Sequence, residues 1–351
     1  MTSLSSAEAC GEIARLSAIA ADFRRRMEAD PGSLYPAHAE TLLQLGALLA
    51  NQGEKENALE AVAESVLLFR ALAGAQPAAF RLHLASALNS LSGRFSEAGM
   101  AEEARATSVE SVEIANLALA DQPDQARYVL VAGLINQAGL SMRNDDAETT
   151  IAVLGEAVRT FCDGGEAGAP YMAPMIEALH RAAMGFAETD KWEEAITLRR
   201  MMVSLFAAEP PSAILHLLGL ALQQGSAAMG KARRHAEAAA LGEEAVALGR
   251  TLCAADAAVY GVFLAQTLGN LAGRRHDMGE NHAGLELALE AVNLFHTSMG
   301  EEPGTAVPAL VVTLRNLTNI LSALGLTEQA ATVNEQRAQL QATLELQVSK
   351  V

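Results

Sequence analysis

Apolar residues return at helical spacing along most of the chain, and turn-forming residues interrupt them at regular intervals. From Tyr35 to Gln52 apolar residues lie three or four positions apart, Gly53 can adopt the left-handed conformation that ends a helix, and the 3.6-residue period resumes from Glu54 to Ala73. This pattern predicts two helices joined by a tight turn.

The pattern recurs with a period of about 45 residues. One measure of the period is the spacing of the prolines Pro31, Pro77, Pro123, Pro170, Pro210 and Pro303. A second is a triplet ending in valine, at residues 64–66, 110–112, 156–158, 201–203, 244–246 and 290–292. We expect repeats at approximately 34–77, 78–123, 124–170, 171–211, 212–258, 259–304 and 305–351. Residues 1–33 are expected to hold a helix, from about Ala7 to Glu28, that caps the array.

The internal signature of a unit distinguishes between classes of helical repeat. The segment LGALLANQGEKENALEAVAES, from Leu45 to Ser65, resembles the tetratricopeptide pattern, with Gly53 at the turn and Ala58 five residues later. The usual unit has about 34 residues, and the longer units here resemble the kinesin light chain type.

The resemblance covers residues 34–351 and is weaker in the third to fifth repeats, where Asp145, Asp190 and Arg233 replace the turn glycine. It implies an all-α fold, a right-handed α-solenoid of about seven helix-turn-helix repeats whose first helices line a concave groove. A non-enzymatic protein or peptide scaffold, adaptor or chaperone is the function expected of such a groove.

The composition of the chain restricts the classes of partner and the metal sites that can be expected. The net charge of −17 disfavours nucleic acid and anionic membranes as main partners. Cys10, Cys162 and Cys253 are too scattered for a thiolate metal site and are expected to be reduced and buried. The chain shows no secretion signal and no uninterrupted membrane span, so a cytoplasmic location is expected. The sequence does not determine whether the chain forms homo-oligomers.

The stretch GSAAMGKA, from Gly225, matches the spacing of a phosphate-binding loop up to Lys231, but Ala232 stands where a magnesium-binding hydroxyl belongs. The repeat register places it inside a first helix, where no backbone amides are free. We therefore expect neither a nucleotide nor any other cofactor, and no catalytic residue is assigned.

A polar residue precedes the signature position of every repeat, although each lies within an apolar helix. This polar row consists of Gln44, Ser90, Asn136, Arg181, Gln224, Asn270 and Asn316. The basic residues Arg94, Arg143, Lys231 and Arg274 follow one or two turns later. The position of the polar row resembles the one that faces the groove in tetratricopeptide proteins. Amides can bind a peptide backbone and arginine a carboxylate, so an acidic segment or a C-terminal carboxylate is the expected ligand.

Several alternatives stay open at this point. The polar row could instead bond neighbouring helices to one another as a structural ladder. The protein could also be a small-molecule or peptide sensor acting through a partner, or an enzyme built on the solenoid. The segment HDMGENH, from His276 to His282, collects metal-capable side chains but lacks the spacing of a metal site. Trp192 is expected to be a packing residue.

Overall fold

The computed structural model describes residues 6–27, 34–164, 171–206, 209–298 and 306–348. Within these ranges the chain forms fifteen helices joined by turns, with no strand. Three of the turn prolines, Pro31, Pro170 and Pro303, and the expected helix end at Glu28 lie outside the described residues. The chain divides into two compact units, residues 1–182 and 183–351.

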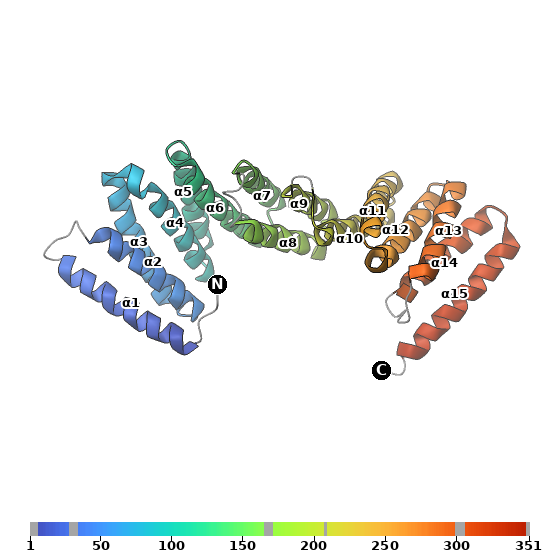
Figure 1. Cartoon of the computed structure of the whole chain (residues 1–351), viewed down its shortest axis with the longest axis horizontal. Coiled ribbons are helices and arrows are strands. Elements are labelled where there is room, and N and C mark those ends of the chain that lie inside the picture. Colours follow the sequence, from blue (N-terminus) through green and yellow to red (C-terminus); the bar gives the residue numbers. More distant parts are fainter. Residues whose placement is uncertain (1–5, 28–33, 165–170, 207–208, 299–305, 349–351) are drawn as a thin grey trace. The chain divides into compact units, whose positions relative to one another are not determined.

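Unit 1 contains α1 to α7 and the first part of α8. The bounds are α1 Ser6–Met27, α2 Tyr35–Asn51, α3 Lys55–Ala75, α4 Pro77–Glu97, α5 Ala101–Ala118, α6 Pro123–Arg143, α7 Ala147–Cys162 and α8 Met172–Glu188. From α1 to α7 each helix packs against the next, and the first helices α2, α4 and α6 also contact one another (Figure 1). Unit 1 is therefore a row of helix pairs that follows the N-terminal helix α1 in chain order.

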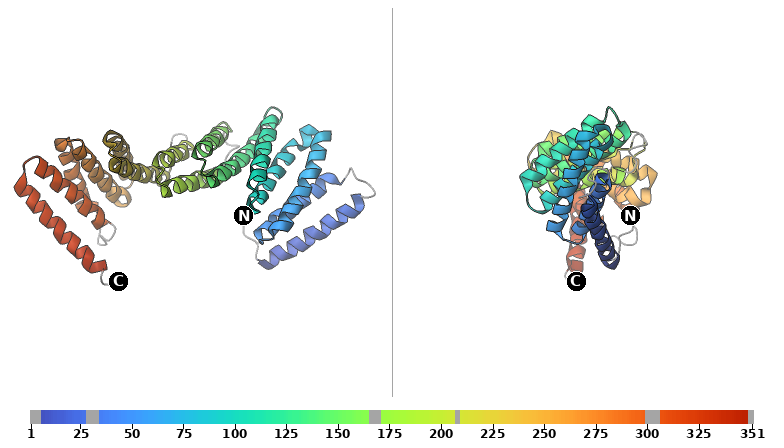
Figure 2. Two further views of the ribbon diagram at one scale, coloured as in Figure 1. Left: turned by 180° about the vertical axis from the view of Figure 1, so that it is seen from behind. Right: turned by 90° about the vertical axis from the view of Figure 1, so that its left-hand side faces the viewer.

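Unit 2 repeats this arrangement. After the end of α8 it contains α9 Trp192–Ser204, α10 Ser212–Lys231, α11 His235–Ala255, α12 Ala257–Asp277, α13 Asn281–Ser298, α14 Ala306–Ala323 and α15 Thr327–Val348. Neighbouring helices from α9 to α15 lie side by side in chain order, as the left view shows (Figure 2). The first helices α10, α12 and α14 contact one another here too. The predicted all-α, tetratricopeptide-like repeat fold is confirmed.

All seven turns within the helix pairs have the same backbone conformation. Four use glycine at φ between 77° and 83°, namely Gly53, Gly99, Gly279 and Gly325. The other three use Asp145, Asp190 and Arg233 at φ of 56°, 58° and 61°. At the last of these, the amide of Arg234 donates to the Met229 carbonyl (2.9 Å) and that of Arg233 to Gly230 (3.1 Å), which together form a Schellman motif. Sequence register alone identified all seven positions.

Small residues bring the two helices of a pair close together. A Cβ on Gly46 would lie 2.4 Å from the Val62 side chain, so only glycine allows α2 and α3 to meet there. The buried hydroxyls of Ser65 and Ser111 each donate to a carbonyl of the preceding first helix, that of Ala39 and of Ala85, both at 2.7 Å. These contacts explain why the valine triplet carries a small residue at its centre in most repeats.

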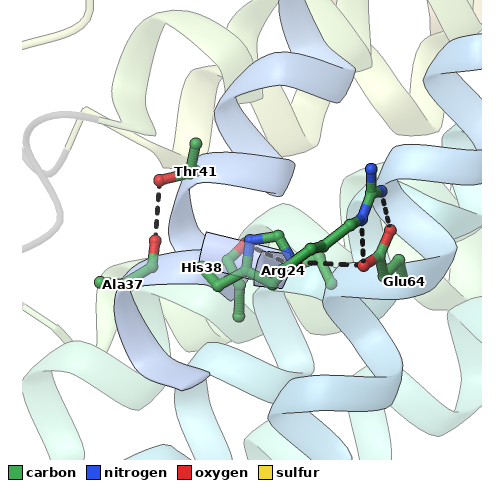
Figure 3. Close-up of polar contacts among 7 residues, drawn as sticks. Arg24, Ala37, His38, Thr41 and Glu64 are labelled. Carbon is green, nitrogen blue, oxygen red and sulfur yellow. Dashed lines mark hydrogen bonds and ion pairs between the residues drawn. The ribbon is translucent and has the colours of Figure 1, made fainter. Parts of the chain in front are cut away.

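The N-terminal helix α1 docks through a polar cluster at the start of the array (Figure 3). The Arg24 guanidinium pairs with the Glu64 carboxylate of α3, and His38 of α2, which is fully buried, lies with Nε2 3.2 Å from the same carboxylate. The Phe23 ring packs against the His38 imidazole. The bond from Arg24 is the main reason that the pKa of Glu64 is lowered; burial opposes it. Glu64 thus joins three helices.

Arginine–glutamate pairs link successive second helices at repeat spacing. The pairs after that of Arg24 and Glu64 are Arg70–Glu110, Arg200–Glu244 and Arg250–Glu290. Each glutamate begins a valine triplet, so the triplet marks a contact between repeats as well as within one. These side chains are largely exposed, and each pair is worth at most about 1 kcal/mol.

The cysteines are less buried than the sequence predicted. Cys10 of α1 and Cys162, the last residue of α7, are exposed, and Cys253 is partly buried. In the described part of the chain α14 alone is long and apolar enough to span a membrane by composition. Its buried residues, among them Leu310, Leu317 and Ile320, pack into the core of unit 2.

Candidate functional site

The polar row lies on the first helices, α2 to α14, but its members have different surroundings. Gln44, Arg181 and Gln224 are exposed, whereas Ser90, Asn136, Asn270 and Asn316 are partly buried. The three exposed side chains are more accessible to a ligand than the other four, but exposure alone does not show which members bond a neighbouring helix.

Asn136 connects two first helices of unit 1. Its Nδ2 donates to the Asn89 side-chain oxygen at 3.0 Å and approaches the Ser92 hydroxyl at 3.3 Å, across the contact between α6 and α4. The Ser92 hydroxyl in turn donates to the Ala104 carbonyl at 2.7 Å. Asn136 therefore takes part in a ladder between repeats, which was the structural alternative for the polar row.

Asn316 plays the same part in unit 2. Its Nδ2 donates to the Gly269 carbonyl at 3.0 Å, from α14 to α12. A Cβ on Gly273 would lie 2.8 Å from this amide, so the glycine leaves the space that Asn316 occupies. In contrast, Asn270 has no side-chain hydrogen bond to the described part of the chain.

A cleft on the first-helix face of unit 1 collects five predicted residues. Its volume is about 440 Å³, and the five are Ser90, Arg94, Asn136, Arg143 and Arg181. Its walls come from α2, α3, α4, α6 and α8. We call it the arginine cleft.

Glycines keep the arginine cleft open. Gly93 and Gly139 line it, and a Cβ built on either would meet no atom within 4 Å. Each stands three residues after a member of the polar row, Ser90 or Asn136, and so on the same helical face. Sequence reasoning missed both, although a glycine at the same offset in two repeats was a usable signal.

The arginine cleft carries unbalanced positive charge. Arg94 pairs with Glu97 of its own helix at 2.9 Å, and Arg181 pairs with Glu177. Arg143 instead donates to the Ser96 hydroxyl of α4, and no carboxylate among the described residues lies within ion-pair distance of it. Three guanidinium groups thus face two carboxylates, and Arg143 has a charge that only a ligand or solvent can balance.

A smaller cleft of about 270 Å³ adjoins the arginine cleft between α6, α7 and α8. Arg143, Arg181 and Gly139 line both, while Met142 and Leu154 give the smaller one an apolar wall. The two guanidinium groups therefore stand between a polar and an apolar space.

Unit 2 has a groove of its own, of about 690 Å³, beside α10. It contains the predicted residues Gln224 and Lys231, together with Trp192 and Arg234. The Trp192 indole donates to the Asp190 carboxylate at 3.2 Å, and Arg234 pairs with Glu193 and Glu237. Lys231 is exposed and has no described ion pair.

The other predicted residues lie outside the lining of these clefts. They are Gln44, Asn270, Arg274 and Asn316. Arg274 pairs with Asp277 at 3.1 Å and packs on Gly230, where a Cβ would collide with its guanidinium. Arg274 is thus a contact between α12 and α10.

The segments with metal-capable or phosphate-loop spacing form ordinary helix and turn structure. Among the described residues no three His, Cys, Asp or Glu side chains are placed to hold a metal ion, and His276 of the segment HDMGENH contacts Asn281 at 2.7 Å. The residues Gly225 to Lys231 form the last two turns of α10, with Gly225 packed against Ile196, so the phosphate-loop spacing falls near the C-terminal end of a helix. The register argument holds, although it placed this stretch nearer the helix centre.

The fold and its turns define a tetratricopeptide-like repeat protein. No protein-family model and no curated protein matches the chain. Among solved structures, BtubC (BKLC) from P. vanneervenii is similar over 70% of this chain and 92% of that one, with 14% identity and a TM-score of 0.39.

Two further solved structures are similar. A putative kinesin light chain from Podosopora anserina with nearly identical TPR-like repeats has 16% identity and a TM-score of 0.36, covering 64% of this chain and 98% of its own. A circular tandem repeat protein has 17% identity and a TM-score of 0.42, covering 96% and 92%. These similarities say nothing about what this chain binds, and its classification rests on its own helix pairs and turns.

Proposed function

We propose that the chain is a non-enzymatic protein-interaction scaffold, adaptor or chaperone that binds a carboxylate-bearing peptide segment in the arginine cleft. The observation that carries this proposal is Arg143, a guanidinium without a carboxylate partner at the edge of an open cleft. Arg94 and Arg181 line the same cleft, and their carboxylate partners lie on their own helices. A ligand carboxylate can accept two parallel hydrogen bonds from such a group.

The polar groups of the cleft also suit a peptide backbone. Asn89 and Ser90 line it beside the arginines. A carboxamide offers a donor and an acceptor to a peptide bond, which tolerates many side chains. Asn136 has a different part, because its amide already bonds α4, so it positions Asn89 rather than holding the ligand.

The test is binding of fluorescein-labelled peptides, measured by anisotropy. One peptide ends in glutamates with a free carboxyl terminus, and its partner has glutamines and an amidated end. We expect Arg143→Gln to weaken binding of the acidic peptide tenfold or more, since hydrogen bonds between charged groups are worth about 1.5–3 kcal/mol.

A matched control is Arg105→Gln, which removes an exposed arginine of α5 that pairs with Glu102 outside the cleft. It should leave the affinity unchanged. Equal affinities for the two peptides, or equal effects of the two variants, would reject the proposal. Circular dichroism of each variant checks that the helices are intact.

The groove of unit 2 is a second candidate site for binding a carboxylate-bearing peptide. Lys231 and Gln224 offer a cation and a carboxamide, as in the arginine cleft. Trp192, the single tryptophan of the chain, lines this groove. A ligand that enters it should change the indole fluorescence, and Lys231→Gln should remove that change. A cytoplasmic location and the absence of nucleic-acid and membrane partners stay predictions.

A further inference from the structure

A second pocket lies beside the arginine cleft, between the N-terminal halves of α4 and α6. Its volume is about 390 Å³, and it is lined by Leu82, His83 and Ser86 of α4 and by Asp124, Gln125, Tyr128 and Val129 of α6. Nothing in the sequence pattern singled it out, because its residues are ordinary apolar and aromatic helix positions. We call it the apolar pocket.

The walls of the apolar pocket are held in place by aromatic contacts. The His83 imidazole stacks on the Phe69 ring at a centroid distance of 5.6 Å and packs against Phe80 at 5.8 Å. On the other side Tyr128 meets the edge of the Tyr171 ring and remains 42% exposed. A pocket whose walls are fixed before binding loses little conformational entropy when it is filled.

Charge at the rim of the apolar pocket is mostly balanced. Asp124, its single carboxylate, lies 3.4 Å from the Arg127 guanidinium. The pocket therefore does not favour a cation, and its lining selects an uncharged side chain.

The apolar pocket and the arginine cleft follow one another along the same two helices, α4 and α6, and this stretch is called the groove of unit 1. On α4, Ser86 of the pocket and Ser90 of the cleft are one turn apart on the same face, and on α6 Tyr128 precedes Asn136 by about two turns. From Ser86 to Arg94 the groove runs about 12 Å, at 1.5 Å per residue. An extended peptide advances about 3.3–3.6 Å per residue, so about four residues span this distance.

We propose that the peptide bound in the arginine cleft places a leucine or phenylalanine side chain in the apolar pocket, about four residues from its carboxylates. This inference rests on the proposed function, because the arginines define where the acidic part of the same peptide lies. The charge of the cleft and its continuity with the pocket select this occupant over a separate apolar ligand.

The test uses labelled glycine- and serine-based peptides with glutamates at one end. One series carries a single leucine at about two to about seven residues from the glutamates, and a reference peptide carries none. Filling the pocket should strengthen binding about tenfold or more at a spacing of about four residues, and less at the shortest and longest spacings. Ser86→Leu, which puts a larger side chain into the lining of the pocket, should abolish this gain without changing the affinity for the reference peptide.

Tyr128→Ala gives a second variant that removes a wall instead of filling the pocket, and it should also reduce the gain. The matched control is Leu117→Ala, which removes an exposed apolar residue of α5 that does not line the pocket. Equal binding of the leucine and reference peptides, both dependent on Arg143, would overturn this inference and leave the proposed function standing. No binding of any acidic peptide would overturn both.

Discussion

Arg233 provides a direct test of how the repeat turns are built. It occupies a left-handed backbone conformation, at φ of 61°, in the turn between α10 and α11. Its side chain is exposed and has no described hydrogen bond or ion pair, so a substitution there changes the backbone preference and little else. We expect Arg233→Gly to stabilise unit 2.

The expected size follows from two opposing effects. A residue with a Cβ in this conformation costs about 1–2 kcal/mol, which glycine avoids. Glycine also gives the unfolded chain more freedom, at a cost of about 0.5–1 kcal/mol. The net gain in the free energy of unfolding is therefore about 0.5–1 kcal/mol, or about 1–4 °C in melting temperature for a unit of this size.

The measurement is urea denaturation followed by the fluorescence of Trp192, which lies in unit 2 beside this turn. Arg233→Ala is the matched control, because it removes the same charge but keeps a Cβ. It should leave stability near the wild-type value. The reverse change, Gly279→Ala, should destabilise unit 2 by about 1 kcal/mol, since its Cβ would meet no atom and only the backbone conformation resists it.

Two results would refute this reasoning. If Arg233→Gly and Arg233→Ala stabilise equally, the loss of a positive charge is the cause and the backbone is not. If Arg233→Gly destabilises, the turn does not require a glycine-like conformation in solution.

Three further predictions concern contacts between helices. Ser111→Ala should lower the free energy of unfolding by about 1 kcal/mol in urea denaturation, because the buried hydroxyl bonds a carbonyl at 2.7 Å. Asn316→Ala should cost about 1 kcal/mol in the same assay and Asn270→Ala much less, since Asn316 alone of the two bonds a neighbouring helix. Because the pKa of Glu64 is lowered chiefly by Arg24, the stability it contributes is present above the unfolded pKa of about 4.3 and is lost as pH falls through the folded value. The protection of the α1 amides against hydrogen exchange, taken relative to the intrinsic exchange rate at each pH, should therefore fall in acid in the wild type, and Glu64→Gln should remove most of this dependence.

The sequence predicted the fold well because the same pattern of apolar positions and turn residues recurs in every repeat. The turn positions of Asp145, Asp190 and Arg233 were predicted although these are not glycines, since the neighbouring units fixed the register, and the structure shows that they also share the positive φ of the turn glycines. The burial of single thiols was not predictable in this way. Whether Cys10 is covered depends on what packs beyond α1, and periodicity carries no such information.

The candidate site was predictable only in part. A polar residue inside an apolar helix can face a groove or bond the next helix, and the same pattern describes Ser90 in the cleft and Asn316 in the ladder. The distinction depends on the distance between helices that are about 45 residues apart in the chain. The apolar pocket could not be predicted from the sequence, because the position of Tyr128 does not differ in pattern from other positions of an amphipathic helix.

The combination of an acidic protein and a basic cleft has a consequence for the speed of binding. A net charge of −17 repels an acidic peptide at long range, while the guanidinium of Arg143 attracts it only at close range. Added salt screens the long-range repulsion first, so between low and moderate ionic strength the association rate should rise. The dissociation rate should rise as well, because salt also competes with the ion pairs that would retain the proposed acidic peptide. Such a protein would exchange its acidic ligands faster, and hold each for a shorter time, as the salt concentration increases.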